Sequence, residues 1–133
     1  MMKLHRSSDT SRGQTLVEFA LIVPLFLLIV VGLFDVGRAV YAYNTAANAA
    51  RAAARVAIVN QDPAVIRAAA RKEAVGLGLT DANITLGACS EIFCPYSVTV
   101  QVPYTPATPL IGTLFDPNIS STATMPVEND ITP

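Results

Sequence analysis

The sequence predicts an α+β protein: a long N-terminal hydrophobic helix that crosses a membrane once and continues outside it, a short second helix and a small antiparallel sheet. Three observations support this fold. Residues 19–34 carry no charge, alanines recur at helical spacing after them, and late segments alternate polar and apolar residues. A chain of 133 residues has room for one modest domain and an anchor. We expect a leader over residues 1–13, a transmembrane and extended helix over 14–60, and a small extracytoplasmic domain over 61–133.

The first element is a membrane-spanning helix over residues 16–34. Its nineteen residues, at about 1.5 Å each, reach nearly across the roughly 30 Å hydrocarbon core of a bilayer. A cleaved secretory signal is the competing interpretation, but its apolar region is usually about 7–15 residues long and ends at a small-residue cleavage site. Here Asp35, Arg38 and more helical sequence follow, so we expect an uncleaved anchor, with a kink or local loosening at Pro24. We interpret Asp35 and Arg38 first as boundary residues that both can reach water, and second as partners of neighbouring subunits.

The charge distribution predicts the orientation of the anchor in the membrane. Lys3, Arg6 and Arg12 outweigh Asp9 in the first thirteen residues, whereas the rest of the chain carries six basic and nine acidic residues. Basic residues before a span keep that end in the cytoplasm. We therefore expect a cytoplasmic N-terminus and a C-terminal domain on the other side of the membrane. Because the outer part has no basic excess, we expect no nucleic-acid partner.

An acidic residue, Glu18, lies at the start of the apolar helix. A carboxylate costs about 3 kcal/mol at the bilayer centre unless it is shallow, protonated or paired. One interpretation is an interfacial side chain that faces lipid headgroups. The other comes from the preceding residues, because Gly13 follows a basic leader and precedes Glu18 by five positions, an arrangement that resembles a prepilin leader. The resemblance implies that a prepilin peptidase cuts the bond between Gly13 and Gln14, and that Glu18 pairs with the freed amine of a neighbouring subunit.

A wider resemblance lies within residues 12–55, a span of about a third of the chain. Residues 12–24, 34–41 and 48–55 are similar to the TadE-like family of tight-adherence pilus proteins. The resemblance implies a minor pilin or pseudopilin that is anchored in the bacterial inner membrane and takes part in pilus assembly or secretion. It also implies other pilin-like subunits and pilus assembly proteins as partners, in the membrane or in an extracellular pilus.

The helix continues beyond the membrane to about Val59, with two distinct faces. Small alanines at spacings of three and four allow close packing against a second backbone. Either the chain's own C-terminal domain or another subunit could supply that backbone. A polar stripe on another side makes this part amphipathic. The alanines are Ala39, Ala42, Ala46, Ala49 and Ala53, and the polar stripe consists of Tyr41, Asn44, Asn48, Arg51 and Arg55.

The C-terminal part begins with a second helix. Asp62 is a good N-cap and Pro63 suits the first helical position, so we expect a helix from Pro63 to about Val75, ending at Gly76. Three β-like runs follow, over residues 84–86, 97–104 and 119–127. In the middle run Val98, Val100 and Val102 alternate with polar residues, which predicts a strand with one buried face packed on the helix.

Cys89 and Cys94 lie between the first two of these runs. Their spacing suits a disulfide that closes a short loop, and it also suits half of a metal site. The C-terminal part has no histidine and no other cysteine, so we expect the disulfide, with a contribution of about 2 kcal/mol.

We expect neither catalysis nor a cofactor or metal. The only histidine, His5, lies in the leader, and no nucleophile set, carboxylate pair or phosphate-binding loop is visible in the sequence. Two functions remain: a TadE-like minor pilin or pseudopilin that is processed and assembled, or an unprocessed, single-pass, membrane-anchored binding module outside the cytoplasm.

Overall fold

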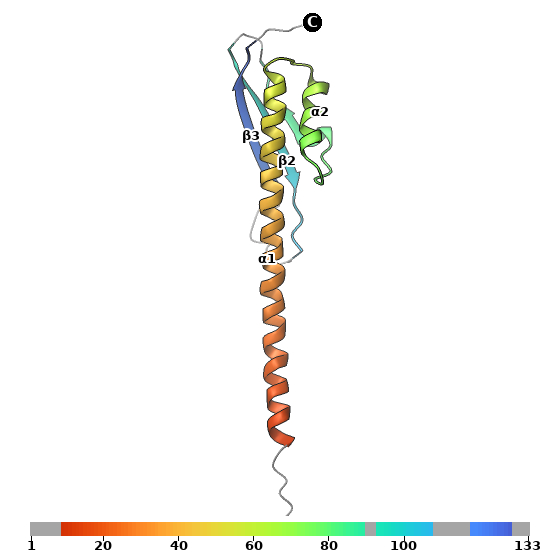
Figure 1. The fold of residues 1–133 in the computed structure, drawn as a ribbon, viewed down its shortest axis with the longest axis vertical. Helices are drawn as coiled ribbons and strands as arrows, with labels where there is room; N and C mark the ends of the chain where they lie inside the picture. Colours follow the sequence, from red (N-terminus) through yellow and green to blue (C-terminus); the bar gives the residue numbers. More distant parts are fainter. Residues whose placement is uncertain (1–8, 90–92, 108–117, 129–133) are drawn as a thin grey trace, which may run out of the picture.

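A computed structural model describes residues 9–89, 93–107 and 118–128 of the chain. Helices α1 and α2 lie side by side on one face of a three-stranded sheet, and the N-terminal half of α1 projects from this domain as a single rod (Figure 1). The predicted α+β fold is therefore confirmed. The elements are α1 (Asp9–Ala57), α2 (Pro63–Glu73), the 3₁₀ helix η1 (Asp81–Asn83), β1 (Ile84–Leu86), β2 (Pro95–Pro103) and β3 (Asn118–Pro126).

Helix α1 begins earlier and ends earlier than the sequence suggested. It begins at Asp9, because extending an existing helix by one residue adds one hydrogen bond at little cost, even through Gly13. It ends at Ala57 and not near Val59, where the Val59 N–H turns to the Val56 carbonyl at 3.1 Å. Residues 1–8 of the expected leader lie outside the described residues.

Pro24 lies inside α1 without ending it. The helix continues without interruption across this residue, and Figure 1 shows no sharp bend in the rod. The kink expected from the sequence is therefore not pronounced, because the loss of one backbone hydrogen bond is tolerated in a long, otherwise regular helix.

Helix α2 begins as predicted and ends two residues early. The Asp62 Oδ1 atom accepts a hydrogen bond from the Ala64 N–H at 2.8 Å, and Pro63 occupies the first turn. The helix stops at Glu73, and Ala74 already has non-helical backbone angles. The chain then reverses at Gly76, whose φ of +85° is a conformation that glycine adopts without steric cost.

The sheet is antiparallel, with β2 between β1 and β3. Val100 pairs with Ile84 of β1 on one side and with Ser121 of β3 on the other. The inward face of β2 packs on α1. Val98, Val100 and Val102 are buried, so the predicted alternation is confirmed. A disulfide joins Cys89 to Cys94 in the loop between β1 and β2, also as predicted. In the entropic account such a short loop contributes about 2 kcal/mol.

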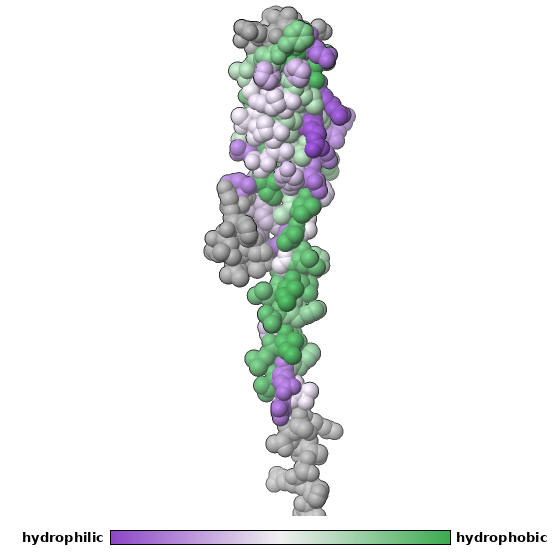
Figure 2. All heavy atoms as spheres, turned by 90° about the vertical axis from the view of Figure 1, so that its left-hand side faces the viewer, coloured by the Kyte–Doolittle hydropathy of each residue, from purple (hydrophilic) through white to green (hydrophobic). Residues whose placement is uncertain are grey.

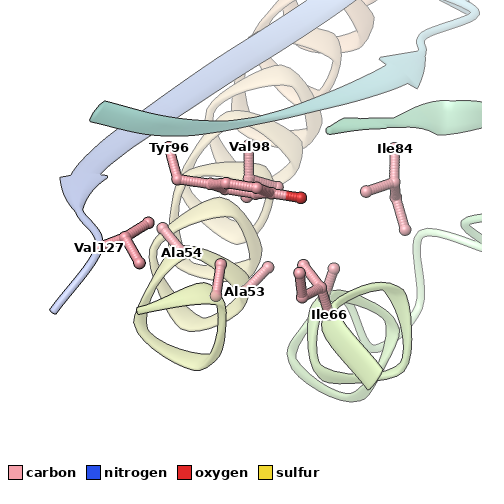
Figure 3. Close-up of a cluster of buried hydrophobic side chains, with 9 residues drawn as sticks. Ala53, Ala54, Ile66, Ile84, Tyr96, Val98 and Val127 are labelled. Carbon is pink, nitrogen blue, oxygen red and sulfur yellow. The ribbon is translucent and has the colours of Figure 1, made fainter. Parts of the chain in front are cut away.

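The core forms where the sheet covers α1 and α2. Figure 3 shows Tyr96 and Val98 of β2 facing Ala53 and Ala54 of α1 beside Ile66 of α2, and all five are buried. Burial raises the pKa of the Tyr96 hydroxyl, and the positive charge of Arg67 opposes that rise. A second cluster extends the same contact toward the membrane end of the domain, with Ala42, Ala46, Ala49 and Ala50 against Val100 and Val102.

The chain's own domain thus covers the predicted alanine face. Ala42, Ala46, Ala49 and Ala53 are buried, while Ala39 is half-buried at the edge of the domain. The residues of the polar stripe are all exposed: Tyr41, Asn44, Asn48, Arg51 and Arg55. Of the two alternatives for the alanines, the local core is the one that the fold contains.

We predict that Ala53→Leu destabilises the outer domain by about 1–3 kcal/mol, because Ala53 is fully buried and a larger side chain would force α1 away from β2. Asn44→Leu places the same leucine side chain on the exposed side of the same helix and should leave stability nearly unchanged. Thermal unfolding of the full chain in detergent measures both. Equal melting temperatures for the two variants would contradict the tight contact.

Candidate functional site

The apolar part of α1 is unusual because its own fold leaves it uncovered. The side chains of residues 16–34 are exposed almost throughout, and Leu21 and Leu33 each expose 73% of their surface. In the described chain this is the one helix long and apolar enough to cross a membrane, and none of its most apolar window is buried. Figure 2 shows the hydrophobic band along the rod, with hydrophilic residues at its lower end. The core helix of a soluble domain would be covered, so the exposed apolar rod indicates a membrane anchor.

At the N-terminal end of this rod, Gln14 and Glu18 lie one turn apart. The Gln14 Nε2 atom donates a weak hydrogen bond to Glu18 Oε1 at 3.4 Å, and both side chains are exposed. Within the described residues, the partner of this carboxylate is a neutral amide and not a cation. Gly13 lies one residue earlier in open space, with no atom within 4 Å of where a side chain would begin. The peptide bond between Gly13 and Gln14 is part of the helix.

At the other end of the rod, Asp35 departs from expectation. The sequence suggested that its carboxylate reaches water, but only 2% of the residue is exposed. Its Oδ1 atom accepts a hydrogen bond from the Ala107 N–H at 2.9 Å, and its backbone carbonyl accepts one from the Tyr104 hydroxyl at 2.7 Å. The segment after β2 therefore folds onto α1 next to the apolar run. The hydrogen bond from the Ala107 N–H replaces water at the buried carboxylate.

Sequence reasoning missed this contact, which we call the Asp35 clasp, because its partners lie 69 and 72 positions later in the chain. The available signal was a lone carboxylate directly after an apolar helix, which requires either water or a partner. Only the path of the chain after β2 decides between the two.

Arg38, in contrast, is exposed as expected. Its Cζ atom lies 5.8 Å from the centre of the Tyr104 ring, within the range of a cation–π contact. The nearby Tyr41 hydroxyl donates to the Val75 carbonyl at 3.2 Å. A cavity of about 300 Å³ lies between these residues, the turn after α2 and the end of β2.

The described residues contain no group of three or more histidine, cysteine or acidic side chains placed to hold a metal ion. Cys89 and Cys94, the one pair considered as half of such a site, are bonded to each other. The functional surfaces to be explained are therefore the exposed apolar rod with Glu18, the boundary region around Asp35 and Arg38, and the polar stripe of α1.

These features define a class of protein in which one long helix has two roles. Its N-terminal half forms a single apolar anchor, and a small domain packs on its C-terminal half. The family model described as TadE-like protein matches residues 13–55, which is α1 from Gly13 almost to its end. The resemblance predicted from the sequence is thereby confirmed over this helix. No curated protein and no solved structure matches the chain. The TadE-like match together with the apolar helix fits a pilus-associated, membrane-anchored protein.

We predict that Asp35→Ala lowers the stability of the outer domain by about 1–2 kcal/mol, because the Ala107 N–H loses a charged acceptor. Asp35→Asn keeps an acceptor oxygen of the same reach and should cost less. Hydrogen exchange at the Ala107 amide, followed alongside thermal unfolding, measures the effect. Wild-type exchange at Ala107 in the alanine variant would show that the clasp does not hold this segment.

Proposed function

We propose that the protein is a TadE-like minor pilin or pseudopilin, a membrane-anchored structural component of pilus assembly or secretion. The observation that carries this proposal is Glu18, an exposed carboxylate that has no cationic partner among the described residues and lies at the start of an uncovered apolar helix. It lies inside the segment that matches the TadE-like family. An unpaired charge raises the free energy of the protein in this position. An assembly that supplied a positive partner would offset most of that cost.

Processing would create such a partner. Cleavage between Gly13 and Gln14 leaves a new terminal amine on Gln14, four residues before Glu18 on the same helix. In a pair of neighbouring subunits, the amine of one and the carboxylate of the other would meet at the lipid boundary. Both charges are then matched between packed helices, whereas each is unmatched in a lone subunit.

The peptidase would act on a bond that is helical in the isolated chain. Only residues 9–13 precede that bond in α1, which is little more than one turn, and helix ends open readily. Gly13 further weakens this turn, because glycine costs about 1 kcal/mol relative to alanine in a helix. Local unwinding before cleavage is therefore inexpensive.

Assembly would use surfaces that the fold leaves free. The chain's own sheet covers the alanine face of α1, so that face is not offered to a second subunit. The apolar rod and the polar stripe remain exposed. We place the protein in the bacterial inner membrane, with its N-terminus in the cytoplasm and its domain outside, where a prepilin peptidase, pilin-like subunits and pilus assembly proteins are its partners.

We predict that Gly13→Leu blocks removal of the leader in cells that contain a prepilin peptidase. The fold itself accepts a side chain at this position, so any effect reports on the peptidase and not on folding. Gly32→Leu is the matched control, because Gly32 lies in the same helix with equally open surroundings. Intact-mass analysis of the purified protein should find the wild type and the control beginning at Gln14. If the wild type retains its leader, the unprocessed binding module becomes the better description.

A second prediction concerns assembly after processing. Glu18→Gln should leave cleavage and membrane level unchanged but reduce recovery of the protein with the pilus or assembly fraction at least about tenfold, because the amine of a neighbour loses its charged partner. Glu73→Gln removes an acidic side chain from α2 and should assemble normally. Quantitative immunoblots of membrane and assembled fractions measure both. Normal assembly of the Glu18 variant would contradict the pairing role.

A further inference from the structure

The cavity beside Arg38 lies at the point where the outer domain comes closest to the membrane anchor. It is bordered by Arg38 and Tyr41 of α1, by Gly76 and Leu77 of the turn after α2, and by Tyr104 and Thr105 after β2. Arg38 carries the only charge among the described residues that line it. The remaining walls are aromatic, apolar or neutral polar. A pocket of this kind suits a small anionic group that has an apolar attachment.

Its depth relative to the bilayer follows from helix geometry. Arg38 lies four residues after Phe34, the end of the uncharged run, and therefore about 6 Å beyond the hydrocarbon edge. Each headgroup layer is about 5–8 Å thick, so Arg38 lies within it. Tyr41 and Tyr104 have apolar rings with a polar tip, the side-chain type that is enriched at this level of a membrane.

The arginine is held in a suitable position for phosphate. Its guanidinium lies over the Tyr104 ring, and the residue as a whole is exposed. The Tyr104 hydroxyl is in turn fixed by the Asp35 carbonyl. Asp35 does not line the cavity, and its carboxylate accepts the Ala107 N–H. A planar guanidinium presented in this way can donate two parallel hydrogen bonds to phosphate oxygens.

An apolar track leads from the pocket into the membrane. Phe34, Val31 and Leu27 lie about one, two and three turns below Arg38 on the same face of α1. Their exposed fractions are 70%, 40% and 53%, so no part of the described domain covers them. An acyl chain could follow these side chains while its phosphate stays at Arg38.

We propose that this pocket binds the phosphate headgroup of an anionic glycerophospholipid, such as phosphatidylglycerol, from the leaflet next to the outer domain. The lipid fastens the domain to the membrane surface through Arg38, and an acyl chain lies along α1. This inference rests on the membrane anchorage in the proposed function and not on processing or filament assembly.

The test uses the full chain in nanodiscs of phosphatidylcholine, with and without phosphatidylglycerol. Native mass spectrometry measures how strongly phosphatidylglycerol is enriched among the lipids that stay bound. We expect Arg38→Gln to lower this enrichment about fivefold, because one cation at the surface is lost. Arg38→Lys should lower it in part, because lysine keeps the charge but not the planar fork.

Arg51→Gln is the matched control, because Arg51 lies on α1 about 20 Å farther from the membrane. It should keep wild-type enrichment, and unchanged melting temperatures show that each variant is folded. Equal losses in the Arg38 and Arg51 glutamine variants, or full enrichment in Arg38→Gln or Arg38→Lys, would overturn the pocket. Displacement of the lipid by inorganic phosphate would identify a site for free phosphate and overturn the lipid assignment. Failure to insert into phosphatidylcholine alone would instead disprove the anchorage.

Discussion

The close contact between the alanine face of α1 and the valine face of β2 is the constraint on which the rest of the structure depends. Alanine brings the helix backbone close to the sheet, and Val98, Val100 and Val102 fill the space that remains. Through this contact, the helix that carries the apolar anchor also forms part of the core of the domain. A domain built on the distal half of its own membrane helix cannot separate from the anchor without losing that core.

This arrangement limits how the outer domain can move relative to the membrane. Flexible linkers allow a domain to tumble above its anchor, but here the helix passes from the apolar run into the domain without a break. The Asp35 clasp adds a second attachment at the lower edge, through hydrogen bonds from Tyr104 and Ala107. Tyr104 also stacks against Arg38, so clasp and cavity share a residue. The distance between sheet and bilayer is therefore set by rigid structure.

Local patterns in the sequence were enough to predict most of the fold. Three signals each predict a single element: the uncharged run, the Asp62 cap, and the alternation of Val98, Val100 and Val102 with polar residues. Each signal is contained in a few consecutive residues. The end of α1 and the end of α2 were misplaced by two residues, because helix ends depend on which nearby carbonyl a frayed N–H selects.

The boundary region could not be predicted in the same way. Asp35 and Arg38 are three residues apart and both looked like interfacial charges, yet one is buried and the other exposed. The difference comes from residues 104–107, which follow β2 and contact α1 at Asp35. The motif around Gly13 and Glu18 differs, because it can be recognised in the sequence, whereas among the described residues Glu18 contacts only the Gln14 amide.

In the proposed assembly, the two ends of the apolar rod would place different demands on a neighbouring subunit. Between residues 19 and 34 the side chains of α1 are apolar and most are exposed, so helices can pack there through shape and van der Waals contact in a medium that excludes water. Beyond Asp35 the exposed surface of α1 includes the polar stripe with Asn44, Asn48 and Arg51, and contacts there compete with water. Charge matching is therefore worth most at the lower end, where Glu18 lies. A neighbour selected there by its charge would be aligned along the whole rod before the outer domains touch.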